Sequence, residues 1–216
     1  MEPQQDMVER IIRQVLADPG RSDGRDPYLV PVGISNRHIH LSRPDMDTLF
    51  GPGSSLRRKK AMKQPGQFAA DETVTLIGPR GRLSGVRVLG PLRPETQVEI
   101  SVADGFVLGV TPPLRLSGRL DGTPGLEIAG PRGSLRIDRG VIAARRHIHM
   151  LPATARRLGL SNGQEVDVEV GGERAGILRR VAVRVDEASA FEMHIDVEEA
   201  NAFCLRNNDL VLIRRS

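Results

Sequence analysis

Short runs of Val, Ile and Leu alternate with polar residues along most of the chain, and Gly or Pro separates one run from the next. Alternation with a period of two is typical of strands that bury one face, and Gly and Pro mark the turns between them. Three stretches each predict two strands joined by a turn, at residues 72–91, 125–145 and 164–185. The first two turns share the sequence GPRG, at 78–81 and 130–133. The pattern predicts a mainly β protein made of compact barrels.

Helical patterns are limited to short segments. Short helices are expected at 43–50, 152–159 and 197–204, where they would cap the barrels. Near the N-terminus, residues 7–16 place apolar side chains on one helical face and charged or amide side chains on the opposite face. The Gly, Pro and Asp residues that follow are typical of a flexible linker. Three interpretations stay open: a helix packed on its own domain, a docking peptide for another protein, or a helix on a membrane surface.

The sequence Arg-His-Ile-His occurs twice, and each copy precedes a predicted helix. One copy contains His38 and His40, and the other contains His147 and His149. Because residues i and i+2 of a strand point to the same face, the two histidines of each copy are neighbours, and the Ile between them points into a core. Two neutral imidazoles at this spacing can share a metal ion, and zinc suits them. The repeat indicates two related halves that each present one pair.

Further ligands are needed to complete two metal sites. The fifth histidine, His194, lies at a predicted strand end before a helix, and it would complete a three-histidine site with one pair. The segment at 93–101 offers Glu95 and Glu99 to the other pair. Glu99 alternates with apolar residues, so it is either exposed on an amphipathic strand or buried for a reason. A catalytic zinc typically has three protein ligands and one open position.

Composition narrows the range of partners. The net charge of +4 favours an anionic partner, but scattered arginines and only 3% aromatic residues argue against nucleic acid. The densest basic cluster, RRKK at 57–60, is expected in an exposed loop. The single cysteine, Cys204, excludes an intramolecular disulfide and is expected to be a small packing residue. No apolar run approaches the roughly 18 residues of a membrane span, and no signal-peptide pattern opens the chain, so a cytoplasmic protein is expected.

From about residue 28 to the C-terminus, the sequence resembles the PduL-type phosphotransacylases, also called phosphate propanoyltransferases. Five segments carry this resemblance: VPVGISNRHIHLS, QPGQFAADETVTLIGPRG, VRVLGPLRPETQVEIS, RHIHM and FEMHIDVEEANA. The resemblance implies two small β-barrel domains capped by short helices. The first domain would comprise residues 28–36 and 145–216, the second 37–144, and both would follow the helix and linker at 1–27.

The resemblance also implies two zinc ions in a cleft between the domains. The first ion would be held by His38, His40 and Glu99. The second ion would be held by His147, His149 and His194. Arg93 matches the phosphate-contacting arginine of the family, so Arg93 and Glu99 are the expected catalytic residues. Positions matching the coenzyme A contacts of the family are Ile34, Ser35, Asn36, Arg80, Arg87 and Asn201.

The implied reaction interconverts acyl-CoA plus phosphate and acyl phosphate plus CoA by direct transfer, with propanoyl-CoA or acetyl-CoA as the acyl donor. In this interpretation the first zinc holds the CoA sulfur, and the second zinc and Arg93 hold phosphate. Residues 6–17 resemble the extension that directs family members of propanediol degradation into bacterial microcompartments, where they would contact shell or cargo proteins. A homodimer is expected from the family. The ligand types alone also permit a dinuclear zinc hydrolase or a metal-stabilised cargo or scaffold protein.

Overall fold

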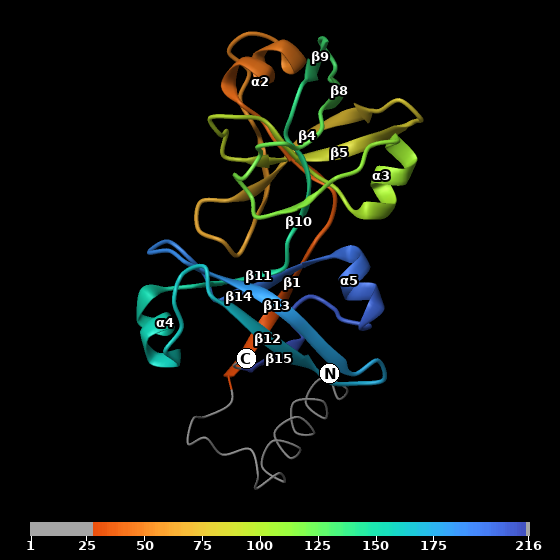
Figure 1. Cartoon of the computed structure of the whole chain (residues 1–216). Helices are drawn as coiled ribbons and strands as arrows, with labels where there is room; N and C mark the ends of the chain where they lie inside the picture. The colour runs from red at the N-terminus through yellow and green to blue at the C-terminus, as the bar shows by residue number, and fades with distance from the viewer. Residues whose placement is uncertain (1–27, 215–216) are drawn as a thin grey trace, which may run out of the picture. The chain divides into compact units, whose positions relative to one another are not determined.

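The computed structural model of the protein describes residues 28–214, so the helix and linker expected at 1–27 lie outside the described part (Figure 1). The described chain divides into two compact units. One unit comprises residues 28–35 and 146–214, and the other comprises 36–145. The second unit is therefore inserted into the first along the chain, directly after the first strand.

The first unit is a closed barrel with the strand order β1-β14-β11-β13-β12-β15. Its strands are β1 (Tyr28–Ser35), β11 (His147–Met150), β12 (Glu165–Val170), β13 (Gly176–Val185), β14 (Glu192–Asp196) and β15 (Leu210–Arg214). Its helices are α4 (Pro152–Leu158) and α5 (Val197–Ala202). β1 closes the barrel because it pairs in parallel with β14 and antiparallel with β15. Closure removes the unpaired edges that an open sheet would expose.

The second unit is built on a nine-stranded sheet, with α3 beside β5 and α2 beside β9 (Figure 1). The strand order is β7-β10-β6-β2-β5-β4-β8-β9, and β3 pairs with β4 beside this path. Its strands are β2 (His38–His40), β3 (Arg58–Ala61), β4 (Phe68–Ile77), β5 (Arg82–Gly90), β6 (Gln97–Glu99), β7 (Leu114–Arg115), β8 (Leu126–Ala129), β9 (Ser134–Ile137) and β10 (Val141–Ala144). Its helices are α2 (Arg43–Phe50) and α3 (Val102–Leu108).

The mainly β architecture with short helices is confirmed, with a closed barrel in the first unit and a curled, half-barrel sheet in the second. The three predicted strand pairs are antiparallel hairpins, formed by β4 and β5, by β8 and β9, and by β12 and β13. Each unit has its own core of aliphatic side chains. Ile39 and Ile148, the residues between the paired histidines, are fully buried in these cores, as the strand period requires. Their burial holds both His-x-His strands in register.

The helices expected at 43–50, 152–159 and 197–204 are present as α2, α4 and α5. Helix α3 is absent from the sequence-based prediction. It begins after Ser101, whose hydroxyl accepts from the backbone N–H of Asp104 while the Asp104 carboxylate accepts from the N–H of Ser101. This capping box satisfies two backbone donors that a helix start leaves without partners. The helix ends at Gly109, which adopts the left-handed conformation that glycine permits.

The first GPRG turn, between β4 and β5, docks on the end of α3. It is closed by a hydrogen bond from Gly78 N–H to Gly81 O, and Arg80 N–H donates to Leu108 O at 3.1 Å. A Cβ at Gly78 would lie 2.1 Å from the same carbonyl oxygen, so only glycine fits there. The turn thus supplies a donor to a carbonyl at the helix end.

The second GPRG turn, between β8 and β9, docks on the end of α2 in the same way. Gly130 N–H donates to Gly133 O, and Arg132 N–H donates to Leu49 O at 3.0 Å. A Cβ at Gly130 would lie 2.5 Å from Leu49 O. The repeated sequence therefore builds a repeated contact between a hairpin turn and a helix C-terminus.

Two local predictions are wrong. Most of the basic cluster at 57–60 belongs to strand β3 rather than to a loop, although its side chains are exposed as expected. Cys204 is exposed rather than packed, and its φ of 53° places it in a tight turn after α5. Among residues 28–214, no helix is long and apolar enough to cross a membrane.

Candidate metal centres

The candidate ligands of each unit come from two antiparallel strands that each lead into a short helix. β2 precedes α2 and pairs with β6, which precedes α3; likewise β11 precedes α4 and pairs with β14, which precedes α5. The register places His38 opposite Glu99 and His147 opposite His194. The two histidine pairs predicted from the repeat are therefore presented by matching local arrangements, one in each unit.

The arginine of each Arg-His-Ile-His sequence is held by the helix that follows the partner strand. Arg37 contacts Asp104 of α3 through two nitrogen–oxygen distances of 3.0 and 2.7 Å. Arg146 donates to Glu199 of α5 at 2.9 Å. Asp104 and Glu199 are each the third residue of their helix, so both carboxylates belong to the first helical turn. These ion pairs tie the start of each ligand strand to a helix.

The first group consists of His38, His40 and Glu99 in the second unit. Their candidate ligand atoms all lie within 4.8 Å of one another. The Nε2 atom of His38 is 3.5 Å from one Glu99 oxygen, and Nε2 of His40 is 4.0 Å from the other. The three side chains are 8%, 3% and 10% exposed, respectively. Burial excludes the interpretation of Glu99 as an exposed residue of an amphipathic strand.

Backbone carbonyls orient both imidazoles of the first group. Nδ1 of His38 lies 2.8 Å from Asn36 O, and Nδ1 of His40 lies 3.2 Å from Leu89 O. A carbonyl oxygen only accepts, so each Nδ1 carries a proton, and Nε2 is the ring nitrogen left to face a cation. Second contacts of this kind set the tautomer of metal-binding histidines. Both Nε2 atoms therefore face the Glu99 carboxylate.

Electrostatics keep this group ready to bind a cation. Burial lowers the pKa of His40 to about 3, and the positive charges of His38 and Arg93 add to the effect. Burial alone would raise the pKa of Glu99, but attraction and hydrogen bonding to His38 hold that pKa well below its usual range. Burial also lowers the pKa of His38, and the Glu99 carboxylate outweighs it and raises this pKa. His40 and Glu99 are thus held in the forms that bind metal, a neutral imidazole and an ionised carboxylate, whereas a bound cation has to displace the proton that Glu99 favours on His38.

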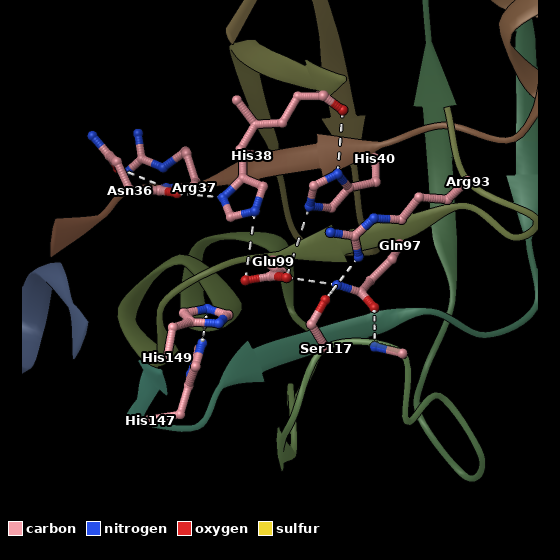
Figure 2. A network of polar contacts seen from close by, with 12 residues as sticks. Asn36, Arg37, His38, His40, Arg93, Gln97, Glu99, Ser117, His147 and His149 are labelled. Carbon is pink, nitrogen blue, oxygen red and sulfur yellow. Dashed lines mark hydrogen bonds and ion pairs between the residues drawn. The ribbon is translucent and has the colours of Figure 1, made fainter. Parts of the chain in front are cut away.

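A hydrogen-bond network joins Glu99 to Arg93 (Figure 2). Gly118 N–H donates to Gln97 Oε1 at 2.7 Å, which leaves the amide nitrogen to donate to Glu99 at 2.6 Å and to Ser117 Oγ at 2.8 Å. Nη1 of Arg93 donates to the same hydroxyl at 2.7 Å. The side chain of Gln97 is thus fixed at both ends, and it holds one oxygen of Glu99 in place.

The second group consists of His147, His149 and His194 in the first unit, and their candidate ligand atoms also lie within 4.8 Å of one another. The Nε2 atoms of His147 and His149 are 3.0 Å apart. The ring centroids of the three imidazoles are 4.7 to 5.2 Å apart. Burial lowers the pKa of His149 to about 3, with further repulsion from His147, His194 and Arg184. Three convergent imidazoles form a donor set that fits a divalent ion such as zinc.

Three polar residues near these groups escaped the sequence analysis: Gln97, Ser117 and Glu192. Gln97 and Glu192 are 1% and 5% exposed, and each lies on a strand two residues before the third candidate ligand of its group. The signal in the sequence was a polar residue at the strand position two before a candidate ligand, which lies on the same face as that ligand. It was missed because burial of short strands such as β6 is not visible in the sequence pattern.

Three of the expected coenzyme A residues lie in the second unit. The carbonyl of Asn36 accepts from His38. Arg87 lies opposite His38 on β5 and donates to the carbonyls at positions 70 and 71. Arg80 lies in the first GPRG turn. Asn36 and Arg87 are thus both adjacent to the first group.

The other three expected coenzyme A residues lie in the first unit. Ile34 and Ser35 end strand β1, next to Ile195 and Asp196 of β14. Asn201 is exposed on α5, and its carbonyl accepts from Arg174. These positions border the strand that carries His194.

Residues 31–206 match the family model described as phosphate propanoyltransferase. The chain belongs to the phosphate propanoyltransferase family. This match confirms the resemblance recognised in the sequence. Phosphate propanoyltransferases are acyltransferases.

Named relatives cover nearly the whole chain. It is 68% identical to the phosphate propanoyltransferase of Rhodopseudomonas palustris strain BisB18, with 99% of each chain covered. It is 62% identical to that of Rhodobacter capsulatus, with 98% of each covered. Identity to the phosphate propanoyltransferase of Salmonella typhimurium is 48%, with 91% of each covered.

Proposed function

We propose that this protein interconverts acyl-CoA plus inorganic phosphate and acyl phosphate plus CoA, with propanoyl-CoA or acetyl-CoA as the acyl donor. One observation carries the proposal: in a chain of the phosphate propanoyltransferase family, a buried group of His38, His40 and Glu99 is joined by hydrogen bonds to Arg93. This arrangement combines a cation site with an anion-binding side chain. A reaction between a thioester and phosphate needs the first to stabilise the leaving thiolate and the second to hold the phosphate.

Both groups are assigned to zinc in this proposal. One ion is held by His38, His40 and Glu99. The other ion is held by His147, His149 and His194. Zinc with three protein ligands supplies an open position for a thiolate and polarises a carbonyl. The donor sets support this assignment because structural zinc sites usually have four protein ligands and often include cysteine.

Arg93 is assigned to phosphate. Its planar guanidinium matches the oxygens of a phosphate in two parallel hydrogen bonds. The bond from Nη1 to Ser117 fixes the direction of the guanidinium, and Arg93 N–H donates to Leu41 O at 2.9 Å. A side chain held in this way loses little further entropy when it binds an anion. Arg93 thus positions the attacking phosphate, and Glu99 contributes to catalysis as a ligand of the first ion.

The transfer is direct. A phosphate oxygen forms a bond to the acyl carbon, the carbon–sulfur bond breaks, and the thiolate of CoA leaves with the electron pair. No side chain has to carry the acyl group. Cys204 is exposed in a turn of the first unit and hydrogen-bonds through its backbone N–H to Asn201 O, so it belongs to neither candidate group. Incubation with acyl-CoA in the absence of phosphate should therefore leave the mass of the protein unchanged.

Single substitutions test the two candidate groups. Glu99→Ala and His194→Ala should each remove about one equivalent of bound zinc and nearly all turnover, because each takes one of three ligands from a site. Metal content and phosphate-dependent CoA release are the measurements. Glu95→Ala is the matched control, since Glu95 lies in the same segment but is exposed and pairs with Arg139. Full metal content in both ligand variants would contradict the assignment.

Phosphate dependence separates the acyltransferase from a dinuclear zinc hydrolase. The proposed enzyme releases CoA only when phosphate is present, and acyl phosphate accumulates in equal amount. A hydrolase with the same ligands would release CoA without phosphate. A metal-stabilised scaffold would release none and would unfold on chelation.

The proposal also assigns a targeting role to the N-terminal segment. Residues 6–17 direct it to shell or cargo proteins of a bacterial microcompartment in the cytoplasm, in a pathway of propanediol degradation. The amphipathic pattern of this segment and the linker that follows support the assignment. Deletion of residues 1–24 should spare activity and abolish encapsulation, and loss of folding would show that the segment belongs to the domain.

A homodimer is also proposed. Its support is an exposed apolar face on and near α3, where Phe106 is 73% exposed beside Val102 and Val107 at 44% and 49%. Exposed apolar patches of this kind often mark interfaces. Phe106→Glu should lower the mass measured by light scattering from that of a dimer to that of one chain.

A further inference from the structure

We infer that Glu192 is a positioning residue of the second metal centre: its carboxylate holds the proton of His194 on Nε2, so that His194 presents Nδ1 to the ion. This inference rests on the proposed zinc site of His147, His149 and His194. It adds a residue to that site and assigns a different donor atom to one of its three histidines.

The hydrogen bond between the two side chains determines the tautomer. Nε2 of His194 lies 2.8 Å from Oε2 of Glu192. A carboxylate oxygen that accepts this bond requires a proton on Nε2, which leaves Nδ1 as the ring nitrogen able to bind an ion. The glutamate side chain is 7% exposed and the histidine side chain 20%, so little water competes for this contact.

The strand order places Nδ1 on the side of the other histidines. β14 lies between β1 and β11, and the register sets His194 next to Gly33 on one side and next to His147 on the other. The Cδ2 atom of His194, which is bonded to Nε2, lies 3.0 Å from the position of a Cβ at Gly33. The Cδ2–Nε2 edge of the ring thus faces β1, and the edge with Nδ1 faces β11.

Glu192 itself stays outside the convergent group. The group whose ligand atoms all lie within 4.8 Å of one another contains His147, His149 and His194, and Glu192 is not a member. By contrast, Nε2 of His147 and Nε2 of His149 are 3.0 Å apart, a spacing that suits two ligands of one ion. The carboxylate therefore acts on the ion through His194 rather than by direct contact.

The room for this carboxylate is provided by Gly33. A Cβ at Gly33 would lie 2.7 Å from Cδ and 2.8 Å from Oε1 of Glu192, which is closer than side-chain atoms approach. The absence of a side chain on β1 thus lets Glu192 reach Nε2 of His194 from the β1 side. Any larger residue at position 33 would displace the carboxylate.

The first centre contains a counterpart of Glu192. Gln97 lies opposite His40 and two residues before Glu99, just as Glu192 lies opposite His149 and two residues before His194. Gln97 donates to the carboxylate ligand at 2.6 Å, whereas Glu192 accepts from the imidazole ligand. The carboxylate ligand Glu99 thus receives a donor, and the imidazole ligand His194 receives an acceptor. The same strand position therefore does the same task in both units, with opposite hydrogen-bond polarity.

The test is nitrogen-15 NMR of the histidine rings in the full-length, zinc-loaded protein. Long-range proton–nitrogen correlations show which ring nitrogen carries a proton and which binds metal. We expect zinc on Nδ1 and a proton on Nε2 of His194, and zinc on Nε2 of His147 and His149. Zinc on Nε2 of His194 would overturn the inference and leave the proposed function intact, whereas a wild-type protein without zinc at this group would overturn both.

Two variants test the role of the carboxylate by different routes. Glu192→Gln keeps the size and removes the charge, and Gly33→Ala keeps Glu192 in the chain but places a methyl group against its carboxylate and against Cδ2 of His194. Each should weaken zinc binding at the second centre by about tenfold to a hundredfold, measured by competition with a chelator, and should broaden or shift the Nε2–H signal of His194. Glu165→Gln, which alters an exposed pair with Arg180 in the same barrel, is the control. Unchanged zinc affinity in folded Glu192→Gln would contradict the inference.

Discussion

In the first centre, a hydrogen bond to a neighbouring group orients each candidate ligand. His38 and His40 use backbone carbonyls, and Glu99 uses the amide of Gln97. Backbone carbonyls are supplied by the fold and leave no mark in the sequence, while Gln97 is a residue that substitution can test. The orienting contacts determine which atom of each ligand faces the ion.

Gln97→Glu should weaken metal binding at the first centre by about tenfold to a hundredfold. A carboxylate at this position cannot donate to Glu99, and it places a second negative charge next to the first. Zinc affinity and the Michaelis constant for phosphate are the measurements, because Ser117 connects the same amide to Arg93. Gln164→Glu, in an exposed turn, is the control. Wild-type zinc affinity in the variant would show that Gln97 does not orient Glu99.

Lowered histidine pKa values predict that the metal-free protein loses stability as the pH falls. His40 and His149 have pKa values of about 3 in the folded state against about 6.5 in an unfolded chain. Between these values the unfolded state binds more protons, so stability drops as the pH decreases from about 6.5 toward 3. The raised pKa of His38 acts in the opposite direction, because its contribution is present at low pH and lost as the pH rises.

The measurement is the urea midpoint of the chelated protein at pH 7 and pH 5. The midpoint should be lower at pH 5, and the difference should shrink in His40→Leu and His149→Leu because each removes a group that must stay neutral when folded. An equal pH dependence in the wild type and both variants would contradict the assignment of the effect to these two residues.

At this scale the sequence predicted ligand types better than their partners. The spacing of His38 and His40 follows from the strand period alone, and the repeat gave the second pair. The burial of Glu99 was left open, because one strand does not reveal what covers its faces. Glu192 was not found, since its role depends on the register of β14 against β1 and β11.

At the scale of elements, the two GPRG turns are contacts between hairpins and helix ends. Each first glycine faces a helix carbonyl too closely for any Cβ. Each arginine contributes its backbone N–H to the same carbonyl, which would otherwise lack a partner at the helix end. The turns therefore fix α2 and α3 on the sheet whose strands carry the first group.

Gly130→Ala should destabilise the protein by about 1–3 kcal/mol, because the added methyl group overlaps the Leu49 carbonyl and its Cβ. Urea unfolding gives the change in free energy. Arg132→Ala is the control, since it shortens the side chain of the same turn and keeps the backbone N–H that donates to Leu49 O. An unchanged free energy of unfolding in Gly130→Ala would show that the turn and the helix can separate enough to accept the methyl group.

The hairpins were predictable because each is local: two alternating runs and a turn residue specify it. Helix α3 was missed because seven residues give almost no periodicity, although its Ser-x-x-Asp capping box was visible. Pairing between distant strands, such as the parallel contact of β10 with β6, was beyond reach, because no local residue pattern records which strands meet.

At the scale of the whole molecule, each compact unit contains one complete candidate centre and one core. A segment with its own core is expected to fold alone. Residues 36–145 expressed by themselves should therefore unfold cooperatively, bind one zinc ion and show no acyl transfer. The same segment with Glu99→Ala is the control and should bind none. An unfolded segment would mean that the first unit is required for its stability.

The insertion of one unit into the other has a consequence for synthesis. Strand β1 leaves the ribosome before every other described strand, yet it pairs with β14 and β15, and Ile34 N–H bonds to Asn207, 173 residues further along. The inserted unit needs only neighbouring chain and can form while the nascent polypeptide is still growing. The barrel has to wait until translation has nearly ended, with its opening strand exposed throughout, so the interval before chain release is when this protein most needs protection from aggregation.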